Sequence, residues 1–305
     1  MIFVDPLFQR SLVCVVRRYN FSTASGVTQP PQADEHGWTG LPVMFDEVFT
    51  GLYRLGRFSS ASFLGVHPDI SVHAKLLTGG LLPLSITAAS QSIFEAFLGD
   101  AKSDALLHGH SYTAHPIGCH VANVSLQMME DLSTSFQAWH GFKGDWKPSQ
   151  PETLPPKMMP DAGSVAKIEG DSTTHLWSMW SQDYVLTLSK HKLVAHVNAL
   201  GSVLAISLVD KSGSGELILL HQSNLLTPTR TGYTSSAAEG LRDALLNRVS
   251  NTHVQVHSRV LGNVIYLMAS MNSEPKNLSA IEGVLYQKLE MLGDGREKDQ
   301  HSVVA

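Results

Sequence analysis

A carboxylate and a lysine each follow a short apolar stretch in the first third of the chain. Residues 43–48 read VMFDEV and contain Asp46, and residues 70–75 read ISVHAK and end in Lys75. If both stretches are strands of an open α/β sheet, their carboxyl ends lie where such sheets bind ligands. Pyridoxal phosphate (PLP) needs this pairing, because a lysine carries the cofactor as a Schiff base and a carboxylate keeps the pyridine nitrogen protonated. The pair therefore predicts PLP chemistry.

Helices and strands alternate around this pair, and these elements must position it. Apolar periodicity and the placement of proline predict a helix over 7–18, strands over 41–48, 69–74 and 81–88, a short helix over 90–98 and a longer helix from Pro116. Further along, the patterns predict a strand-like stretch over 194–208, a helix over 237–249, two short strands between His253 and Met268 around a turn at Gly262-Asn263, and a helix over 277–292. This order predicts an α/β core with a mixed, mostly parallel sheet, followed by a smaller α+β domain.

The same pattern sets the expected domain boundaries. We expect a partial cofactor-binding domain over 1–142, a linker or surface excursion over 143–183, a small C-terminal domain over 184–293 and a disordered tail over 294–305. Residues 19–38 and 214–231 interrupt the two domains, and we expect both to be insertions.

The composition argues against several classes of protein. The chain has 305 residues, of which 43% are hydrophobic and 16% charged, and its formal net charge is -5. This mild acidity argues against general nucleic-acid binding, and no apolar run approaches the roughly 18 residues of a membrane span. Cys14 and Cys119 give no disulfide framework and fit a reducing compartment. We therefore expect a soluble mitochondrial or cytoplasmic protein, with no convincing targeting segment in this chain.

Motifs at the strand ends resemble a known family. Residues 46–56 read DEVFTGLYRLG and residues 75–80 read KLLTGG, in the order and at the spacing of the class III PLP-dependent aminotransferases, which have fold type I. Residues 108–116, HGHSYTAHP, and residues 259–268, RVLGNVIYLM, resemble two further segments of that class. Within the class the chain is most similar to the diaminopelargonate aminotransferases of biotin biosynthesis, in the eukaryotic form fused behind dethiobiotin synthetase.

The resemblance implies roles for residues around the pair. Lys75 would form the Schiff base and shuttle a proton, Asp46 would pair with the pyridinium nitrogen, and Val48 would pack on one face of the ring. Burial and nearby positive charge would keep the Lys75 amine neutral and nucleophilic. Glu47 and Arg54 belong to the same motif, and we expect them to be structural.

Three further residues receive roles in the same way. The resemblance implies that the Ser111 hydroxyl holds the cofactor phosphate of the partner subunit, and that Arg259 and Gly109 contact the substrate. An alternative for Ser111 is a cap of the following helix, and an alternative for Arg259 is a solvated charge. The nearby histidines and Cys119 lack the spacing of known metal-ligand motifs, so we predict no metal site.

The function implied by the resemblance is one step of biotin biosynthesis. It is the conversion of 7-keto-8-aminopelargonate to 7,8-diaminopelargonate, with S-adenosylmethionine as amino donor, by a homodimer whose active sites lie at the subunit interface. Family members carry a long segment before the residues matched here, so the resemblance also implies an N-terminal truncation. Two alternatives stay open: a catalytically incompetent fragment of such an enzyme, and a class III transaminase for another amino substrate.

Overall fold

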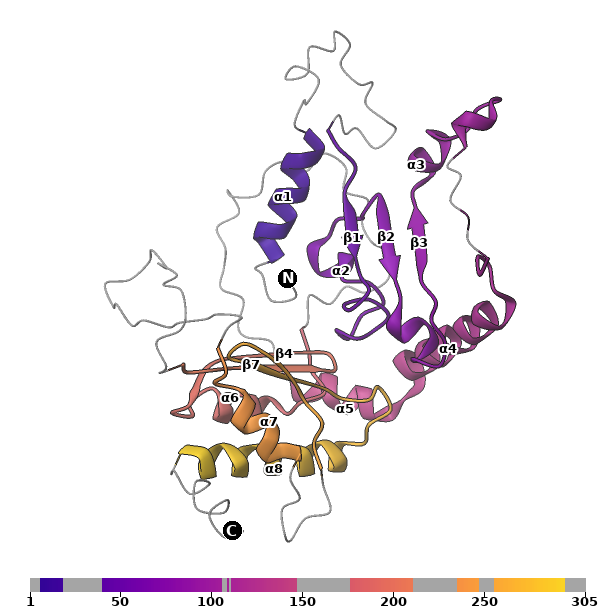
Figure 1. The fold of residues 1–305 in the computed structure, drawn as a ribbon. Helices are drawn as coiled ribbons and strands as arrows, with labels where there is room; N and C mark the ends of the chain where they lie inside the picture. The colour runs from indigo at the N-terminus through magenta and orange to yellow at the C-terminus, as the bar shows by residue number, and fades with distance from the viewer. Residues whose placement is uncertain are drawn as a thin grey trace, which may run out of the picture. The chain divides into compact units, whose positions relative to one another are not determined.

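A computed structural model describes the chain as two compact units. Unit 1 comprises the described residues up to Thr134, and unit 2 comprises those from Ser135 onward (Figure 1). The described residues are 6–18, 40–105, 109, 111–146, 176–210, 235–246 and 255–293. The expected insertions, the expected tail and most of the expected linker lie outside these ranges. No helix in the described ranges is long and apolar enough to cross a membrane.

Unit 1 contains a small sheet with helices before and after it. Its elements are α1 (Pro6–Arg18), β1 (Met44–Asp46), α2 (Ala61–Leu64), β2 (Ile70–His73), the 3-10 turn η2 (Lys75–Thr78), β3 (Ile86–Ala89), α3 (Gln91–Glu95), the 3-10 turn η3 (Lys102–Asp104) and α4 (Pro116–Ser135). The predicted first helix, the second strand and the helix from Pro116 are confirmed, and the first strand is present but shorter than the predicted 41–48. Pro6 and Pro116 each begin a helix, where no N–H is needed. The third strand is shorter than predicted, because residues 81–85 are not part of the ladder.

The three strands form one mixed sheet in the order β1-β2-β3. β1 and β2 are parallel, with Asp46 opposite Val72, and β3 is antiparallel to β2. Figure 1 shows the three strands side by side. Because β1 and β2 run in the same direction, the residues that follow them emerge at the same end of the sheet.

A buried carboxylate holds together the opposite end of this sheet, where β1 and β2 begin. Asp69, which is 5% exposed, precedes β2 and accepts a hydrogen bond at 2.7 Å from the N–H of Val43, which precedes β1. It also accepts one at 2.9 Å from the guanidinium of Arg17, near the end of α1. In return, the Asp69 N–H donates to the Val43 carbonyl oxygen at 2.9 Å. One side chain therefore fixes α1 and the starts of both parallel strands.

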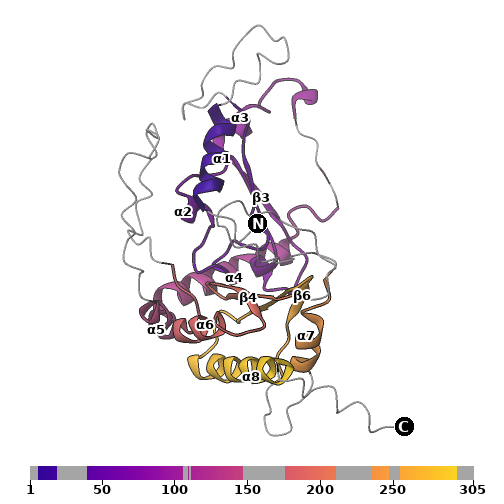
Figure 2. The same ribbon diagram turned by 90° about the vertical axis from the view of Figure 1, so that its left-hand side faces the viewer.

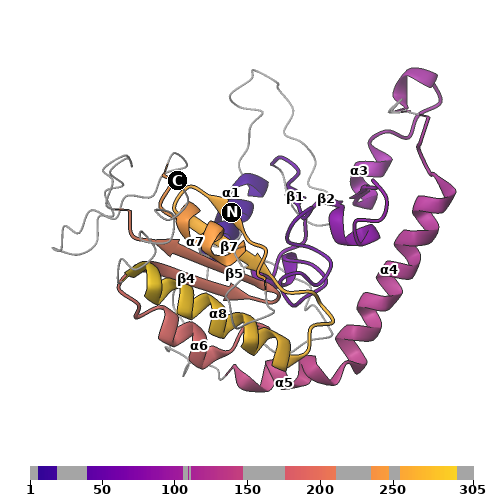
Figure 3. The ribbon, with the colours of Figure 1, turned by 60° about the horizontal axis from the view of Figure 1, so that its bottom comes forward.

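Unit 2 is an antiparallel sheet with helices on one face. Its elements are α5 (Gln137–Asp145), α6 (Gln182–Leu188), β4 (Val194–Leu200), β5 (Val203–Leu208), α7 (Glu239–Leu246), β6 (Arg259–Leu261), β7 (Val264–Met268) and α8 (Pro275–Gly293). The strand order is β4-β5-β7-β6, and all neighbours are antiparallel. Figures 1 and 2 show α6, α7 and α8 on the same face of this sheet, and Figure 3 shows these helices in front of it.

Two hairpins build this sheet. The hairpin predicted around Gly262-Asn263 is confirmed as β6 and β7, with Gly262 at φ +62°, a conformation that glycine adopts without strain. The prediction of one strand-like stretch over 194–208 is incomplete, because this stretch forms both β4 and β5. The turn between them contains Gly201 at φ +54°. The predicted helices over 237–249 and 277–292 correspond to α7 and α8.

The core of unit 2 lies between the sheet and its helices. Ile206 on β5 and Leu285 on α8 are fully buried. Trp180 is 1% exposed and donates its indole N–H to the carbonyl oxygen of Ser202 at 3.0 Å. Trp180 belongs to the last part of the segment 143–183, for which the sequence predicts a linker or surface excursion. This last part packs into the core of unit 2.

Two acidic side chains hold the start of α6 in unit 2. Glu282 on α8 is 8% exposed and accepts a hydrogen bond from the N–H of Ser181 at 2.8 Å. Asp145, at the end of α5, accepts one from the N–H of Gln182 at 2.8 Å. Burial raises the pKa of Glu282, the Ser181 N–H partly opposes this shift, and the charge of Asp145 adds to it. Glu282 therefore binds its proton more tightly in the folded protein than in the unfolded chain.

Asp69→Ala is expected to destabilise unit 1 by about 2–3 kcal/mol, because it leaves the Val43 N–H without its acceptor and removes the carboxylate that pairs with Arg17. Hydrogen exchange of the β1 and β2 amides in a urea series measures this loss. Asp100→Ala is the control, since Asp100 is exposed and its removal is expected to change stability by no more than about 0.5 kcal/mol. Equal losses in the two variants would contradict the role of Asp69.

Glu282→Gln is expected to stabilise unit 2 at about pH 7 and to have little effect near pH 4.5, the ordinary pKa of glutamate. The folded pKa lies above the unfolded one, so proton binding by Glu282 contributes stability below pH 4.5. This contribution is lost as the pH rises through the folded pKa, whereas glutamine keeps the acceptor for Ser181 without ionising.

Urea midpoints from tryptophan fluorescence at the two pH values measure this difference, because four of the five tryptophans lie in unit 2. Glu239→Gln, at an exposed position in the first turn of α7, is the control. It is expected to show no gain in stability at the higher pH. The same effect of Glu282→Gln at both pH values would show that its ionisation does not limit stability.

Candidate active site

β1 and β2 bring Asp46 and Lys75 to the same end of the sheet in unit 1, where both strands finish. Asp46 is the last residue of β1, and the N–H of the next residue, Glu47, donates to the carbonyl oxygen of Val72 at 3.0 Å. β2 ends at His73, and Lys75 begins the turn η2. Both candidate residues therefore lie at the carboxyl ends of adjacent parallel strands.

Lys75 combines a strained backbone with an unpaired side chain. Its φ is +52°, in the left-handed region that residues other than glycine rarely adopt. Two hydrogen bonds hold the turn: the Thr78 hydroxyl donates to the carbonyl oxygen of Leu82 at 2.6 Å, and the Ser125 hydroxyl of α4 donates to that of Leu76 at 2.8 Å. Among the described residues, the Lys75 ammonium has no hydrogen bond or ion pair. The surrounding structure therefore fixes the position of Lys75 and leaves its amine unengaged.

The surroundings of Lys75 differ from the predicted ones. The sequence predicts a buried lysine near positive charge, whereas the side chain is exposed. The reason lies in the size of the sheet, because three short strands, two of them at edges, provide too few neighbours to enclose a side chain at their ends. The prediction of burial is therefore wrong for the described chain.

The Asp46 carboxylate is exposed and only partly engaged. Its Oδ1 accepts a hydrogen bond from the N–H of Val48 at 3.0 Å, which orients the side chain. Its Oδ2 has no partner in the described ranges and is available to an N–H donor. Val48 is half-buried, so part of its side chain is accessible.

Glu47 anchors the loop that follows β1. Its carboxylate is buried and accepts hydrogen bonds from the Ser59 hydroxyl at 2.5 Å and from the N–H of Ser60 at 2.8 Å. Arg54 is also buried, and its Cζ lies 4.9 Å from the centroid of the Phe49 ring. Burial lowers the pKa of Arg54. Both residues shape this loop, so the prediction that Glu47 and Arg54 are structural is confirmed.

The segment before α4 places Ser111 in an exposed turn that spans residues 111–114. The helix is capped by His115, whose Nδ1 accepts from the N–H of Gly118 at 3.0 Å. The alternative prediction that Ser111 caps this helix is therefore wrong. The Ser111 hydroxyl has no partner within the described part of the chain, and a side chain at Gly109 would meet no atom within 4 Å.

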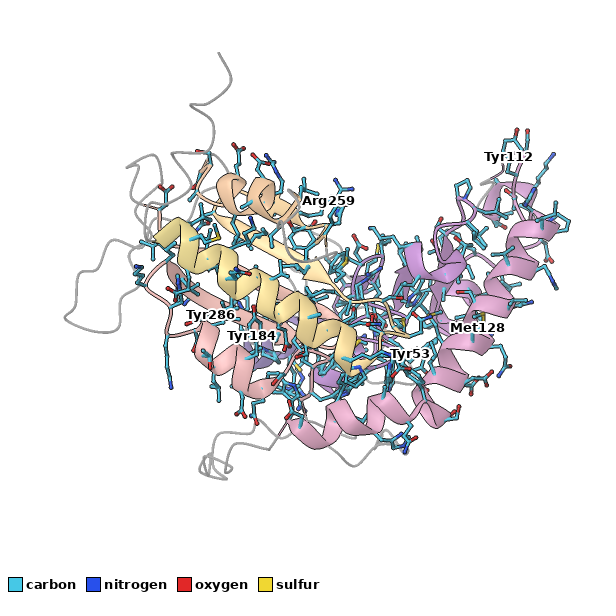
Figure 4. The ribbon with its side chains drawn as sticks, turned by 90° about the horizontal axis from the view of Figure 1, so that it is seen from below. Tyr53, Tyr112, Met128, Tyr184, Arg259 and Tyr286 are labelled. Atoms are coloured by element: carbon cyan, nitrogen blue, oxygen red, sulfur yellow. The ribbon has the colours of Figure 1, made fainter. Side chains whose placement is uncertain are left out.

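Arg259 lies in unit 2, at the start of β6. It is exposed, and it is paired with Tyr266 across the hairpin. Figure 4 shows its side chain extending from the edge of this unit. The structure therefore brings Asp46, Val48 and Lys75 together at one end of the sheet in unit 1, while Arg259 belongs to the other unit.

Sequence reasoning missed two residues that organise unit 1. Asp69 precedes a strand and His115 precedes a proline at a helix start, and these positions are the only signals that the sequence offers for either role. His108 and His110, from the same histidine-rich segment, lie outside the described residues. Within the described ranges, no group of three His, Cys, Asp or Glu side chains could hold a metal ion.

Comparisons with known proteins identify relatives of the chain. Residues 38–140 match the family described as aminotransferase class-III. The bifunctional dethiobiotin synthetase/adenosylmethionine-8-amino-7-oxononanoate aminotransferase of Emericella nidulans is 48% identical over 290 residues, which are 95% of this chain and 32% of that protein. The mitochondrial bifunctional dethiobiotin synthetase/7,8-diamino-pelargonic acid aminotransferase of Arabidopsis thaliana is 33% identical over 287 residues, which are 94% of this chain and 26% of that protein.

Solved structures share the fold. A transaminase with L-ala matches with a TM-score of 0.59 at 18% identity, over 84% of this chain and 47% of that chain. The adenosylmethionine-8-amino-7-oxononanoate aminotransferase of Methanocaldococcus jannaschii matches with a TM-score of 0.55 at 23% identity, over 81% of this chain and 45% of that chain. The chain thus spans no more than 32% of the two curated relatives and less than half of these solved chains. It contains a class III aminotransferase domain, of a family whose members depend on PLP.

Proposed function

We propose that this chain supplies the lysine-bearing part of a PLP-dependent transaminase. The observation that carries the proposal is the parallel pairing of β1 and β2, which puts Lys75 and Asp46 at the same end of the sheet. The strained backbone of Lys75 supports it, because strain of this kind concentrates at functional sites. When bound, PLP supplies an electron-accepting ring.

The donors at this end of the sheet fit that cofactor. The Lys75 amine has no competing partner in the described ranges, so it can hold the cofactor covalently and later carry a proton to and from the reacting carbon of the substrate. Asp46 Oδ2 is free to accept from the ring N–H, and its negative charge holds that proton in place. Val48 restricts where the ring can lie, because its β-branched side chain is rigid.

Three further residues have proposed roles. The Ser111 hydroxyl donates to the cofactor phosphate of the partner subunit, near the first turn of α4, whose N–H groups favour an anion. Arg259 binds a substrate carboxylate through two parallel hydrogen bonds. Gly109 leaves open space where a side chain would otherwise stand, so the backbone can approach the substrate.

The relatives support one substrate pair. The fungal and plant relatives are named as aminotransferases of 8-amino-7-oxononanoate or 7,8-diamino-pelargonic acid. We propose that this protein converts 7-keto-8-aminopelargonate to 7,8-diaminopelargonate in biotin biosynthesis, with S-adenosylmethionine as amino donor. The role of Ser111 requires a homodimer. Two plant relatives are named mitochondrial, which supports the mitochondrial alternative for location.

A second candidate is a catalytically incompetent fragment of such an enzyme. The exposure of Lys75 favours this candidate, because a Schiff-base lysine is expected to be buried in its site. Activity on another amino substrate has weaker support. The beta-alanine--pyruvate aminotransferase of Pseudomonas aeruginosa is 32% identical over 145 residues, which are 40% of this chain. The fungal relative matches at higher identity over far more of the chain.

Borohydride reduction of the purified chain in the presence of PLP is expected to fix the cofactor on Lys75, because its amine is exposed and has no partner among the described residues. Mass spectrometry of the peptide that contains Lys75 measures the adduct. Lys75→Ala is expected to lose it. Lys102→Ala removes an exposed lysine from the same unit and is expected to keep the wild-type yield.

Growth of a strain that lacks the biotin-pathway transaminase separates the candidates. An adduct on Lys75 together with growth supports the proposed reaction. An adduct without growth supports the incompetent fragment, or the other amino substrate if the protein transaminates β-alanine. A folded, soluble sample without the adduct overturns the proposal for this chain.

The free energy of unfolding of Lys75→Gly is expected to exceed that of Lys75→Ala by about 0.5–1 kcal/mol. The reason is that alanine is strained at φ +52° and glycine is not. The greater freedom of glycine in the unfolded chain offsets only part of this gain. Urea unfolding of both variants measures the difference. At Lys102, outside the left-handed region, glycine is expected to be the less stable of the two. The same order at both sites would show that Lys75 is not strained.

A further inference from the structure

The left-handed backbone of Lys75 needs restraints on both sides, because a strained conformation persists only where its surroundings fix it. On the C-terminal side, the Thr78 and Ser125 hydroxyls hold the turn η2. On the N-terminal side, Ala74 is extended, and its side chain is a single methyl group. The nearest residue that can supply a side-chain restraint on this side is therefore His73, at the end of β2.

The His73 ring is enclosed by neighbours on β2 and in the loop after β1. Its Nε2 and the Ser71 hydroxyl are hydrogen-bonded at 3.2 Å. Its Nδ1 is buried, and a side chain added at Gly51 would lie 2.8 Å from this atom, which is too close for carbon and nitrogen. The centroid of the Phe58 ring lies 6.5 Å from that of His73, and Tyr53 packs edge-on against Phe58 at 5.7 Å. The His73 ring therefore has little freedom to turn.

These contacts join the end of β2 to the loop that follows β1. Gly51 is part of that loop, and its N–H donates to the carbonyl oxygen of Glu47 at 3.0 Å. The Glu47 N–H donates to the carbonyl oxygen of Val72, directly before His73, at 3.0 Å. The His73 ring thus packs within a closed set of contacts between the two strand ends that carry the candidate residues.

A histidine is not the residue that packing alone would favour at this position. Among the described residues, His73 Nδ1 has no hydrogen-bond partner. A buried polar atom without a partner costs free energy that a carbon atom in its place would not. Such atoms are rare in folded proteins and often accompany strained or functional positions. Lys75, two residues further on, is a position of this kind.

We propose that His73 is a positioning residue for Lys75. Its ring holds the end of β2 against the loop after β1, and this restraint keeps the backbone of Lys75 in its left-handed conformation. The role acts through the backbone and does not require the ring to touch a cofactor or a substrate. The chemical role of Lys75 rests on the proposed function, whereas the restraint on its backbone can be measured without a cofactor.

The alternative is that His73 only fills space at the end of the sheet. Its removal would then lower the stability of every variant of Lys75 by the same amount. A restraint has a different consequence, because without it the backbone of residue 75 can leave the left-handed region. The advantage of glycine over alanine at this position then disappears. The two readings therefore differ in a quantity that can be measured.

A double-mutant set in the full chain tests the restraint. Lys75→Gly and Lys75→Ala are each combined with His73→Ala, and hydrogen exchange of the β1 and β2 amides in a urea series gives the unfolding equilibrium constants. With His73 present, the constant of the alanine variant is expected to exceed that of the glycine variant about two- to fivefold. With His73→Ala, we expect this ratio to fall to about one or below, because alanine no longer bears the strain.

His120→Ala is the matched control, because His120 is an exposed histidine on α4 of the same unit. It is expected to preserve the ratio between the two Lys75 variants. An unchanged ratio in a folded His73→Ala protein overturns the proposal. If His73→Ala does not fold, Ser71→Ala decides, because it removes only the hydroxyl bonded to Nε2. This milder variant is expected to lower the ratio, and an unchanged ratio would again overturn the proposal.

The yield of PLP fixed on Lys75 by borohydride connects the restraint with the site. At equal PLP concentration and reaction time, we expect a lower yield in His73→Ala than in the wild-type chain and in His120→Ala. An equal yield in all three proteins would contradict the positioning role. A wild-type chain that forms no adduct overturns the proposed function, while the ratio between the two Lys75 variants still decides whether His73 restrains the backbone.

Discussion

The parallel pairing of β1 and β2 is the contact on which the candidate site depends. Asp69 fixes one end of this pair, and Glu47 fixes the loop at the other end. Both are buried carboxylates with satisfied hydrogen bonds, so neither can be removed without leaving donors unpaired. Asp46 and Lys75 take their places from this arrangement and not from any contact with each other.

Hydrogen bonds from neighbouring side chains hold the turn that contains Lys75. Thr78 and Ser125 hold the turn through hydroxyl groups that donate to the carbonyl oxygens of Leu82 and Leu76. The strained conformation is therefore maintained by neighbours, while the functional group stays available. The residues that fix the turn do not cover the Lys75 side chain, which is exposed. The structure therefore fixes the position of Lys75 without burying it.

Local patterns were sufficient to predict much of the fold. The helix from Pro116 and the hairpin at Gly262 depend on proline and glycine chemistry within a few residues, and both are confirmed. The role of Asp69 could not be predicted, because its partners lie 26 and 52 residues away. The degree of burial of Lys75 could not be predicted either, since burial depends on contacts with elements far away in sequence.

The motifs at the strand ends predicted a class III aminotransferase domain, and the comparisons show it. The central claim beyond that finding is that Asp46 and Lys75 form one part of a PLP site. The most direct test is nitrogen-15 NMR of ring-labelled PLP bound to the chain and to its Asp46→Asn variant. We predict a protonated ring nitrogen with Asp46 and an unprotonated one with asparagine at the same pH. Equal protonation in the two proteins would contradict the assignment.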